Sequence, residues 1–215
     1  MRDRILYKAQ QNYLKSLQNE VDPLFQEMEQ FAYENRIPIL DRDSADFLEQ
    51  IILIHRPKKV LEIGTAIAYS TIRIARNLKN TGTVDTIELS KHNITNAKQY
   101  IARLDFKEKI NLIEGDALKV MPAMKTKYDF IFIDADKEDY EKLFYYSLVL
   151  LKKRGIIFVD NLLWKGYPAS RNVPQKFRRS TEHIRKFNKL FVSQKALRTT
   201  ILPIGDGIGL GVKVD

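Results

Sequence analysis

Charged side chains stand at the end of an apolar stretch in the middle of this 215-residue chain. The stretch Tyr128–Asp134 has the length of a buried strand, and Asp136 and Lys137 follow it directly. In open α/β sheets, ligands bind outside the carboxyl ends of the strands. Carboxylates there can hold a cation or a ligand amine, and a lysine can take up a proton. We therefore expect the chemistry of this protein at this edge.

A second stretch, Val60–Ser70, predicts where a cofactor binds. Its sequence, VLEIGTAIAYS, indicates a strand, a turn at Gly64 and the start of a helix. A dinucleotide site would show a second and third glycine close by, so that the backbone could approach a pyrophosphate. The turn has neither these glycines nor the lysine of a phosphate-binding loop. The expected ligand therefore lacks a pyrophosphate.

Acidic residues near the ends of successive predicted strands suggest what that ligand is. Glu88, 24 residues after Gly64, can accept hydrogen bonds from both hydroxyls of a ribose. Asp116, after the next strand, can accept from the exocyclic amine of adenine. With Glu62 and Asp134 they form an acidic rim that suits a ligand with a cationic end. A cationic nucleoside without phosphates fits S-adenosylmethionine (SAM).

Three oxygen ligands at neighbouring strand ends predict a metal site. Asp134 ends one strand, and Asp160 and Asn161 follow the next. Two carboxylates and an amide suit Mg²⁺, which keeps its other positions for water and substrate oxygens. Such an ion can lower the pKa of a bound hydroxyl, and Lys137 could then collect the proton. Taken singly, Asp160 and Asn161 are more often part of a turn, and Lys137 is more often a surface lysine. Together these residues predict transfer to a hydroxyl.

The alternation of strands and helices is typical of a doubly wound parallel sheet. We expect a strand, turn and helix over Val60–Leu78, strands at Val84–Leu89, Ile110–Ile113, Tyr128–Asp134 and Gly155–Val159, and helices at His92–Arg103 and Tyr140–Leu151. A loop at Lys165–Gln175, a helix at Ser180–Val192 and a hairpin of Thr199–Ile204 with Ile208–Val214 complete the chain. These elements form one domain over residues 37–215.

Residues 1–36 are expected to form a helical extension packed on that domain. The apolar spacing predicts a helix over Arg4–Asn35 with a break at Pro23. Ile37–Leu40 is a short extended link, and Asp43 or Ser44 can cap the helix that follows it. An amphipathic helix at this end also suggests a homodimer.

The net charge of +9 is concentrated in one segment. Residues 165–198 hold ten Lys and Arg against one acid, Glu182. This excess suggests a polyanionic partner, although a solvated surface helix would look the same. Without cysteines, disulfides and thiolate metal sites are excluded. No apolar run is long enough to cross a membrane and no signal-peptide core is present, so we expect a cytoplasmic protein without membrane contact.

The motifs together resemble the cation-dependent class I O-methyltransferases, the group of catechol and caffeoyl-CoA O-methyltransferases. The likeness rests on LEIGTAIAYS, DTIELS, EGDA, FIDADKEDY, VDN and PIGDG, in that order. It implies a Rossmann-like fold: a mostly parallel seven-stranded sheet with helices on both faces and a C-terminal antiparallel hairpin. It further implies that Ser70 and the Gly64 turn hold the methionine end of SAM, Glu88 the ribose, and Asp116 with Ala117 the adenine. Asp134, Asp160 and Asn161 would bind Mg²⁺, with Asp134 also near the cofactor amine and Lys137 as base.

Within this group, IPILDRDS, DNLLWKG and the basic stretch look most similar to the bacterial tRNA 5-hydroxyuridine methyltransferases. That likeness implies methylation at the wobble position in the anticodon region of tRNA, and it places Leu40 beside the cofactor. RNA phosphates would then meet basic residues that follow the metal ligands, namely Lys165, Arg171, Lys176, Arg178 and Arg179. Trp164 could stack on a base or pack in the core.

Two other functions remain open from the sequence. The first is O-methylation of small catechols or acyl-CoA phenols, whose CoA phosphates would also attract basic residues. The second is an RNA-binding protein or SAM sensor without turnover. Binding alone does not require metal ligands together with a base, so the presence of both argues against this function. One departure concerns the cofactor turn, where the family usually has glycine and this chain has Ala68. If the backbone there has a positive φ, a side chain is disfavoured.

Overall fold

The computed structural model describes residues 8–17 and 22–214. The contacts within the chain divide it into two compact units, Met1–Ile37 and Pro38–Asp215. This boundary lies one residue from the predicted one, while the packing of the first unit on the second stays a prediction. No helix in the described ranges is long and apolar enough to cross a membrane.

The described residues of the first unit form the helices α1 (Lys8–Ser16) and α2 (Pro23–Asn35). Asp22 caps α2 by accepting a 2.8 Å hydrogen bond from the backbone N–H of Leu24, and Pro23 occupies the first turn, where its missing N–H costs little. The break expected at Pro23 is therefore confirmed. The rest of the predicted helix, residues 4–7 and 18–21, lies outside the described residues.

The second unit begins with α3 (Arg42–His55), whose cap differs from the prediction. The expected caps were Asp43 or Ser44, but the capping residue is Asp41. Its carboxylate accepts hydrogen bonds from the backbone N–H of Ser44 at 3.1 Å and from the Ser44 hydroxyl at 2.7 Å. Asp41 has extended backbone angles, as a capping residue requires, whereas Asp43 and Ser44 are already helical.

Seven strands form one sheet in the order β3-β2-β1-β4-β5-β7-β6. They are β1 (Lys59–Ile63), β2 (Thr83–Glu88), β3 (Ile110–Glu114), β4 (Tyr128–Ile133), β5 (Leu151–Val159), β6 (Leu197–Leu202) and β7 (Ile208–Lys213). The first five strands pair in parallel, and β7 pairs antiparallel with both β5 and β6. The predicted mostly parallel sheet with a C-terminal hairpin is confirmed.

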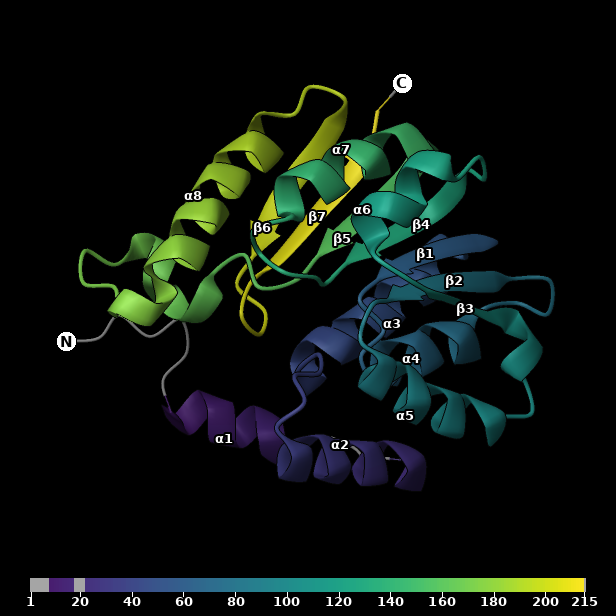
Figure 1. Ribbon diagram of the computed structural model, residues 1–215. Helices are drawn as coiled ribbons and strands as arrows, with labels where there is room; N and C mark the ends of the chain where they lie inside the picture. Colours follow the sequence, from purple (N-terminus) through teal and green to yellow (C-terminus); the bar gives the residue numbers. More distant parts are fainter. Residues whose placement is uncertain (1–7, 18–21, 215) are drawn as a thin grey trace. The chain divides into compact units, whose positions relative to one another are not determined.

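Helices cover both faces of this sheet (Figure 1). One face carries α3, α4 (Tyr69–Asn77) and α5 (Lys91–Ala102), and the other carries α6 (Ala117–Val120), α7 (Tyr140–Leu150) and α8 (Arg178–Ser193). Short 3-10 turns lie at Lys107–Lys109, Met121–Ala123, Trp164–Ala169 and Gln175–Phe177. The last two interrupt the segment expected to be a loop, and α6 was not predicted because four residues show no helical period.

Strand β5 begins four residues earlier than expected. It starts at Leu151 instead of Gly155, and its register against β4 shifts between Tyr128 and Phe130. Residues 152–154 are polar, because this part of β5 lies outside the buried part of the sheet. A polar run of this kind does not predict a strand. The carboxyl end of β5, directly before Asp160, lies where it was predicted.

The core between the sheet and α7 and α8 is rich in aromatic rings. Phe144 of α7 lies 5.5 Å from the ring of Phe187 and 5.7 Å from that of Phe191, both on α8, in edge-to-face contacts. All three side chains are buried, together with sheet residues such as Ile131 and Ile157. Buried aromatic pairs of this kind stabilise a fold by more than the burial of their apolar area alone. The core fixes α7 and α8 against the strands whose ends form the site.

Candidate active site

The turn after β1 touches the end of β4 through its backbone. Gly64 has a φ of +99°, and a Cβ atom placed there would lie 1.9 Å from the backbone oxygen of Asp134. The N–H of Asp134 in turn donates to Ile63 O at 2.9 Å. Only glycine fits this approach, so the predicted cofactor turn and the predicted metal and base segment are brought together.

Alanines occupy left-handed positions in the cofactor turn. Ala66 has a φ of 46° and Ala68, directly before α4, a φ of 72°. Ala68 is fully buried. A side chain in this conformation costs on the order of 1 kcal/mol relative to glycine. The conflict anticipated for Ala68 is therefore present in the structure.

Glu62 lies beneath the turn and not on the acidic rim where it was expected. Its side chain is fully buried and accepts hydrogen bonds from the hydroxyls of Ser70, Thr71 and Thr86. Burial raises the pKa of Glu62 to about 7, although these hydrogen bonds lower it. The prediction of Glu62 on the rim is wrong because Glu62 lies inside β1, before its last residue, and this strand is buried on both faces. Glu62 thus ties β1, β2 and α4 together and supports Ser70.

The remaining predicted cofactor residues lie at or near the strand ends. Glu88, at the end of β2, accepts from the backbone N–H groups of Ala66, Leu89 and Ser90 at 2.8 to 3.0 Å. Asp116 follows β3 and caps α6. The carboxylate of Glu88 is thereby held against the cofactor turn.

Two more predicted cofactor residues flank these elements. Ala117 is the first residue of α6, next to its capping residue. Leu40 is buried just before α3. Contacts of either residue with SAM stay predictions.

The predicted metal ligands follow neighbouring parallel strands. Asp134 comes directly after β4, and Asp160 and Asn161 directly after β5, with Ile133 and Val159 paired in register. Asp160 is buried, and its Oδ1 has no hydrogen-bond partner within the described residues. Burial, and next the charge of Asp134, raise the pKa of Asp160 to about 8. A buried carboxylate oxygen without a donor fits a cation site.

Only two of these ligands are acids. In residues 8–17 and 22–214 no group of three or more His, Asp or Glu is placed to hold a metal ion. The candidate set instead combines the Asp134 and Asp160 carboxylates with the Asn161 amide oxygen, a mixture that hard cations such as Mg²⁺ accept.

Lys137 lies among these residues with its side chain 10% exposed. Its ammonium donates to Asn161 Oδ1 at 2.6 Å and to the Tyr140 hydroxyl at 2.7 Å. It also contacts the backbone oxygen of Ala135 at 3.1 Å and Asp134 Oδ1 at 3.5 Å. The predicted base and two predicted metal ligands therefore form one cluster. Tyr140 was not predicted as part of it, and only its place at the start of α7 could have suggested it.

Backbone strain accompanies this cluster. Asn161, Trp164 and Lys165 have φ values of 61°, 39° and 57°. Left-handed non-glycine residues cost free energy and gather at functional sites. The turn 205–207 packs against the same region, because a Cβ on Gly207 would lie 2.6 Å from the backbone nitrogen of Leu163. This contact gives the late PIGDG motif its place in the site.

Trp164 packs against protein and does not stand free as a platform for a base. Its ring meets that of Phe177 edge to face at 6.2 Å, and it is only partly exposed. Phe177 also stacks on Tyr167 at 5.2 Å. Within the described part of the chain, the indole Nε1 of Trp164 is buried without a hydrogen-bond partner. Of the two expectations for Trp164, packing describes this arrangement.

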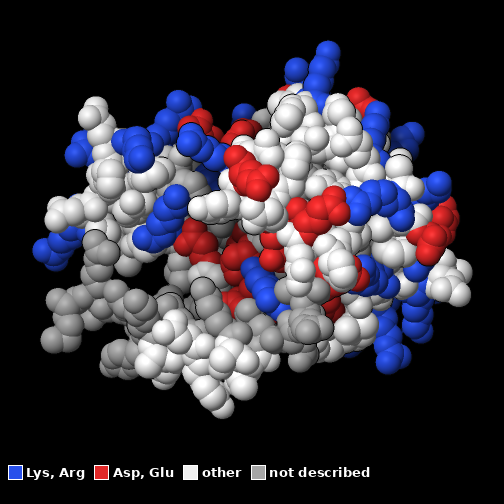
Figure 2. Space-filling view, turned by 90° about the horizontal axis from the view of Figure 1, so that it is seen from below, with Lys and Arg blue, Asp and Glu red and all other residues white. Residues whose placement is uncertain are grey.

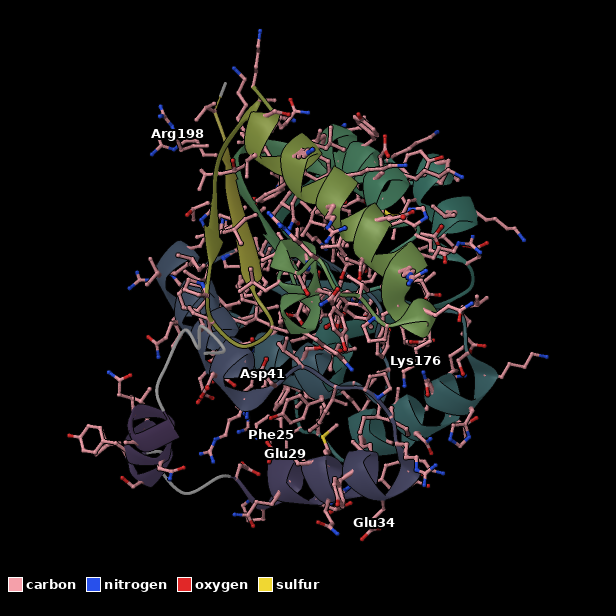
Figure 3. The ribbon with its side chains drawn as sticks, turned by 90° about the vertical axis from the view of Figure 1, so that its left-hand side faces the viewer. Phe25, Glu29, Glu34, Asp41, Lys176 and Arg198 are labelled. Carbon is pink, nitrogen blue, oxygen red and sulfur yellow. The ribbon has the colours of Figure 1, made fainter. Side chains whose placement is uncertain are left out.

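The predicted RNA-binding residues are all exposed: Lys165, Arg171, Lys176, Arg178 and Arg179. Arg171 and Arg178 line a cavity of about 530 Å³ with Arg185 and Thr181. Figure 2 shows that Asp and Glu gather near the middle of one face, while most Lys and Arg of that face lie toward its edges. Figure 3 shows Lys176 near the start of α8 and Arg198 far from it. Arg198 therefore lies apart from the basic residues at the start of α8.

The chain belongs to the O-methyltransferase family, whose sequence model matches residues 15–214. The likeness seen in the motifs is confirmed at this level. A probable caffeoyl-CoA O-methyltransferase of Dictyostelium discoideum is 30% identical over 95% of this chain and 91% of its own length.

Solved structures show the same fold. A putative caffeoyl-CoA O-methyltransferase from Staphylococcus aureus is 32% identical, with a TM-score of 0.87 over 96% of this chain and all of its own. An O-methyltransferase from Bacillus cereus, solved in complex with SAH, is 26% identical, with a TM-score of 0.83 over 95% of this chain and 97% of its own.

Proposed function

We propose that this protein transfers the methyl group of SAM to a hydroxyl with the help of Mg²⁺. The observation that carries the proposal is the contact of Gly64 with Asp134, because it joins the cofactor turn to the cluster of Lys137, Asp134 and Asn161. A methyl donor and an activated hydroxyl must meet within van der Waals distance. At this edge of the sheet the proposed cofactor turn and the proposed metal and base residues are neighbours.

SAM fits the turn and the strand ends described above. Ser70 and the Gly64 turn would hold its methionine part, Glu88 its ribose and Asp116 with Ala117 its adenine. The SAH bound to the Bacillus cereus relative supports a cofactor of this kind. Glu88 already accepts backbone donors on both carboxylate oxygens, so it is held in a fixed orientation for the ribose hydroxyls.

Asp134, Asp160 and Asn161 would hold Mg²⁺, which makes a bound hydroxyl more acidic. The acceptor oxygen attacks the methyl carbon of SAM, and the carbon–sulfur bond breaks as the carbon–oxygen bond forms. SAH would leave as a neutral thioether, and Lys137 would take up the hydroxyl proton. Tyr140 would hold the nitrogen of Lys137 in place for this step.

The acceptor should carry two neighbouring oxygens. The caffeoyl-CoA-type relatives favour a catechol or an acyl-CoA phenol as acceptor. The exposed basic residues after the metal ligands favour the second candidate, 5-hydroxyuridine at the wobble position of tRNA, whose hydroxyl and carbonyl oxygens are also neighbours. A homodimer stays a prediction under either acceptor.

Transfer of labelled methyl from SAM would test the proposal, with Mg²⁺ or with EDTA. The acceptors would be a simple catechol, caffeoyl-CoA and tRNA that bears 5-hydroxyuridine. Mg²⁺-dependent label on any of the three supports the reaction, and the labelled one identifies the acceptor class. Cofactor binding without transfer to any acceptor would favour a non-catalytic SAM or RNA-binding protein.

A further inference from the structure

The ammonium of Lys137 uses oxygens that a divalent cation would also need. Its 2.6 Å contact with Asn161 Oδ1 is the shortest it makes, and Asp134 Oδ1 lies 3.5 Å away. Both residues belong to the candidate metal ligands. The nitrogen also contacts the hydroxyl of Tyr140 at 2.7 Å and the backbone oxygen of Ala135 at 3.1 Å.

Two aromatic rings also surround this ammonium. Its nitrogen lies 4.7 Å from the ring centroid of Tyr140 and 5.6 Å from that of Trp164. At these distances the negative faces of aromatic rings attract a cation. Lys137 is thus held by neutral groups on one side and by prospective metal ligands on the other.

A divalent ion and this ammonium cannot share the Asn161 oxygen at low cost. They would face each other across one atom, in a site where burial weakens the screening by water. The electrostatic repulsion between a doubly charged ion and a singly charged ammonium there is far larger than the free energy that one hydrogen bond contributes. Either the ion or the ammonium therefore takes this oxygen.

We propose that Lys137 is an internal cation that keeps the metal site assembled and must leave Asn161 before a divalent ion binds. The inference rests on the proposed metal site and adds a positioning role for Lys137. It predicts that metal entry moves the ammonium relative to Trp164. Because Trp164 is the only tryptophan of the chain, its fluorescence can report that movement.

The test compares wild type with Lys137→Met and Lys137→Gln in two measurements without acceptor or turnover. Mn²⁺ affinity is measured by electron paramagnetic resonance, and Trp164 fluorescence is titrated with Mg²⁺. In the wild type, fluorescence should change and saturate. Both variants should bind Mn²⁺ at least about tenfold more tightly, since no ammonium has to be displaced, and should lose most of the fluorescence change.

Lys165→Met is the matched control. The nitrogen of Lys165 lies 5.9 Å from the same Trp164 ring, but the side chain is exposed and, within residues 8–17 and 22–214, contacts none of the candidate metal ligands. This variant should keep both the Mn²⁺ affinity and the fluorescence response of the wild type. Circular dichroism would show that each variant is folded.

The outcomes separate this inference from the proposed function. If neither wild type nor Lys165→Met binds Mn²⁺, the metal site itself is wrong. If both bind Mn²⁺ but wild-type Trp164 does not respond, or the Lys137 variants respond like wild type, the displacement of Lys137 is overturned. Unchanged Mn²⁺ affinity in two folded Lys137 variants would overturn it as well.

Discussion

Gly64 and Asp134 are joined through their backbones: a Cβ on Gly64 would lie 1.9 Å from the oxygen of Asp134. These residues directly follow β1 and β4, which are neighbours in the sheet, although 70 residues separate Gly64 from Asp134. The cofactor turn and the metal and base cluster therefore share one rigid junction, and a change on one side should be felt on the other.

Gly64→Ala should lower the free energy of unfolding by about 3 kcal/mol or more and abolish SAM binding, because the clash is with backbone that cannot rotate away. Thermal unfolding and calorimetric SAM titration would measure both. Gly166→Ala is the control: Gly166 also has a positive φ, 76°, but no described atom lies within 4 Å of an added Cβ. It should cost only about 1 kcal/mol. Equal losses in the two variants would contradict the junction.

Ala68→Gly should stabilise the protein by about 0.5–1 kcal/mol. It removes the left-handed strain of Ala68, which exceeds the entropy cost of a glycine. The opposite result is expected for Ala75→Gly, a buried alanine inside α4, which should lose about 1 kcal/mol or more. Denaturant unfolding of both variants would decide. A destabilised Ala68→Gly would mean that the turn is not strained at this position.

Glu62→Gln should change how stability depends on pH. The folded pKa of Glu62, about 7, lies above the unfolded value of 4.5, so the folded state binds the proton more tightly. The contribution of Glu62 is fully present below pH 4.5 and is lost as pH rises to 7, on the order of 3 kcal/mol in all. Relative to wild type, Glu62→Gln should therefore gain stability across this window. Parallel curves for both proteins would show that Glu62 is not buried as a protonated acid.

Asp160→Ala should abolish Mg²⁺-dependent methyl transfer and leave most of the SAM affinity intact, because Asp160 is a metal ligand and not a cofactor contact in the proposal. Turnover with and without Mg²⁺, together with calorimetric SAM binding, would measure this. Asp129→Ala is a useful comparison, since Asp129 is an acid of the same strand pair that binds Lys152 away from the site. Unchanged turnover in Asp160→Ala would remove the metal site.

Arg178→Glu combined with Arg179→Glu should weaken methylation of tRNA at least about tenfold and leave SAM binding alone, if tRNA is the acceptor. The control is Lys195→Glu with Arg198→Glu, an equal change of charge beyond the end of α8; Figure 3 shows Arg198 far from Lys176 near the start of α8. Binding of tRNA should also fall steeply with salt, whereas a small catechol should barely respond. Equal effects of the two double variants would reduce the basic segment to a solvated surface.

The sequence by itself determined the order of the strands and helices and the strand ends that carry the chemistry. Apolar stretches of strand length, a glycine turn and acids such as Asp134 and Asp160 are local features, and parallel strands place their carboxyl ends at one edge. The motifs also predicted the O-methyltransferase family, which the comparisons confirm.

The tertiary structure decided what depends on contacts between distant residues. Glu62 lies below the turn because β1 is buried on both faces, and no local pattern tells a buried acid from one at the rim. Asp41 replaces Asp43 and Ser44 as cap because its backbone is extended there. Lys137 contacts Asn161, 24 residues away, because β4 and β5 pair in register. Helix α7 places the Tyr140 hydroxyl within hydrogen-bond distance of Lys137 and of the Asp160 backbone oxygen. Such contacts arise only when the strands have paired and the core has closed around them.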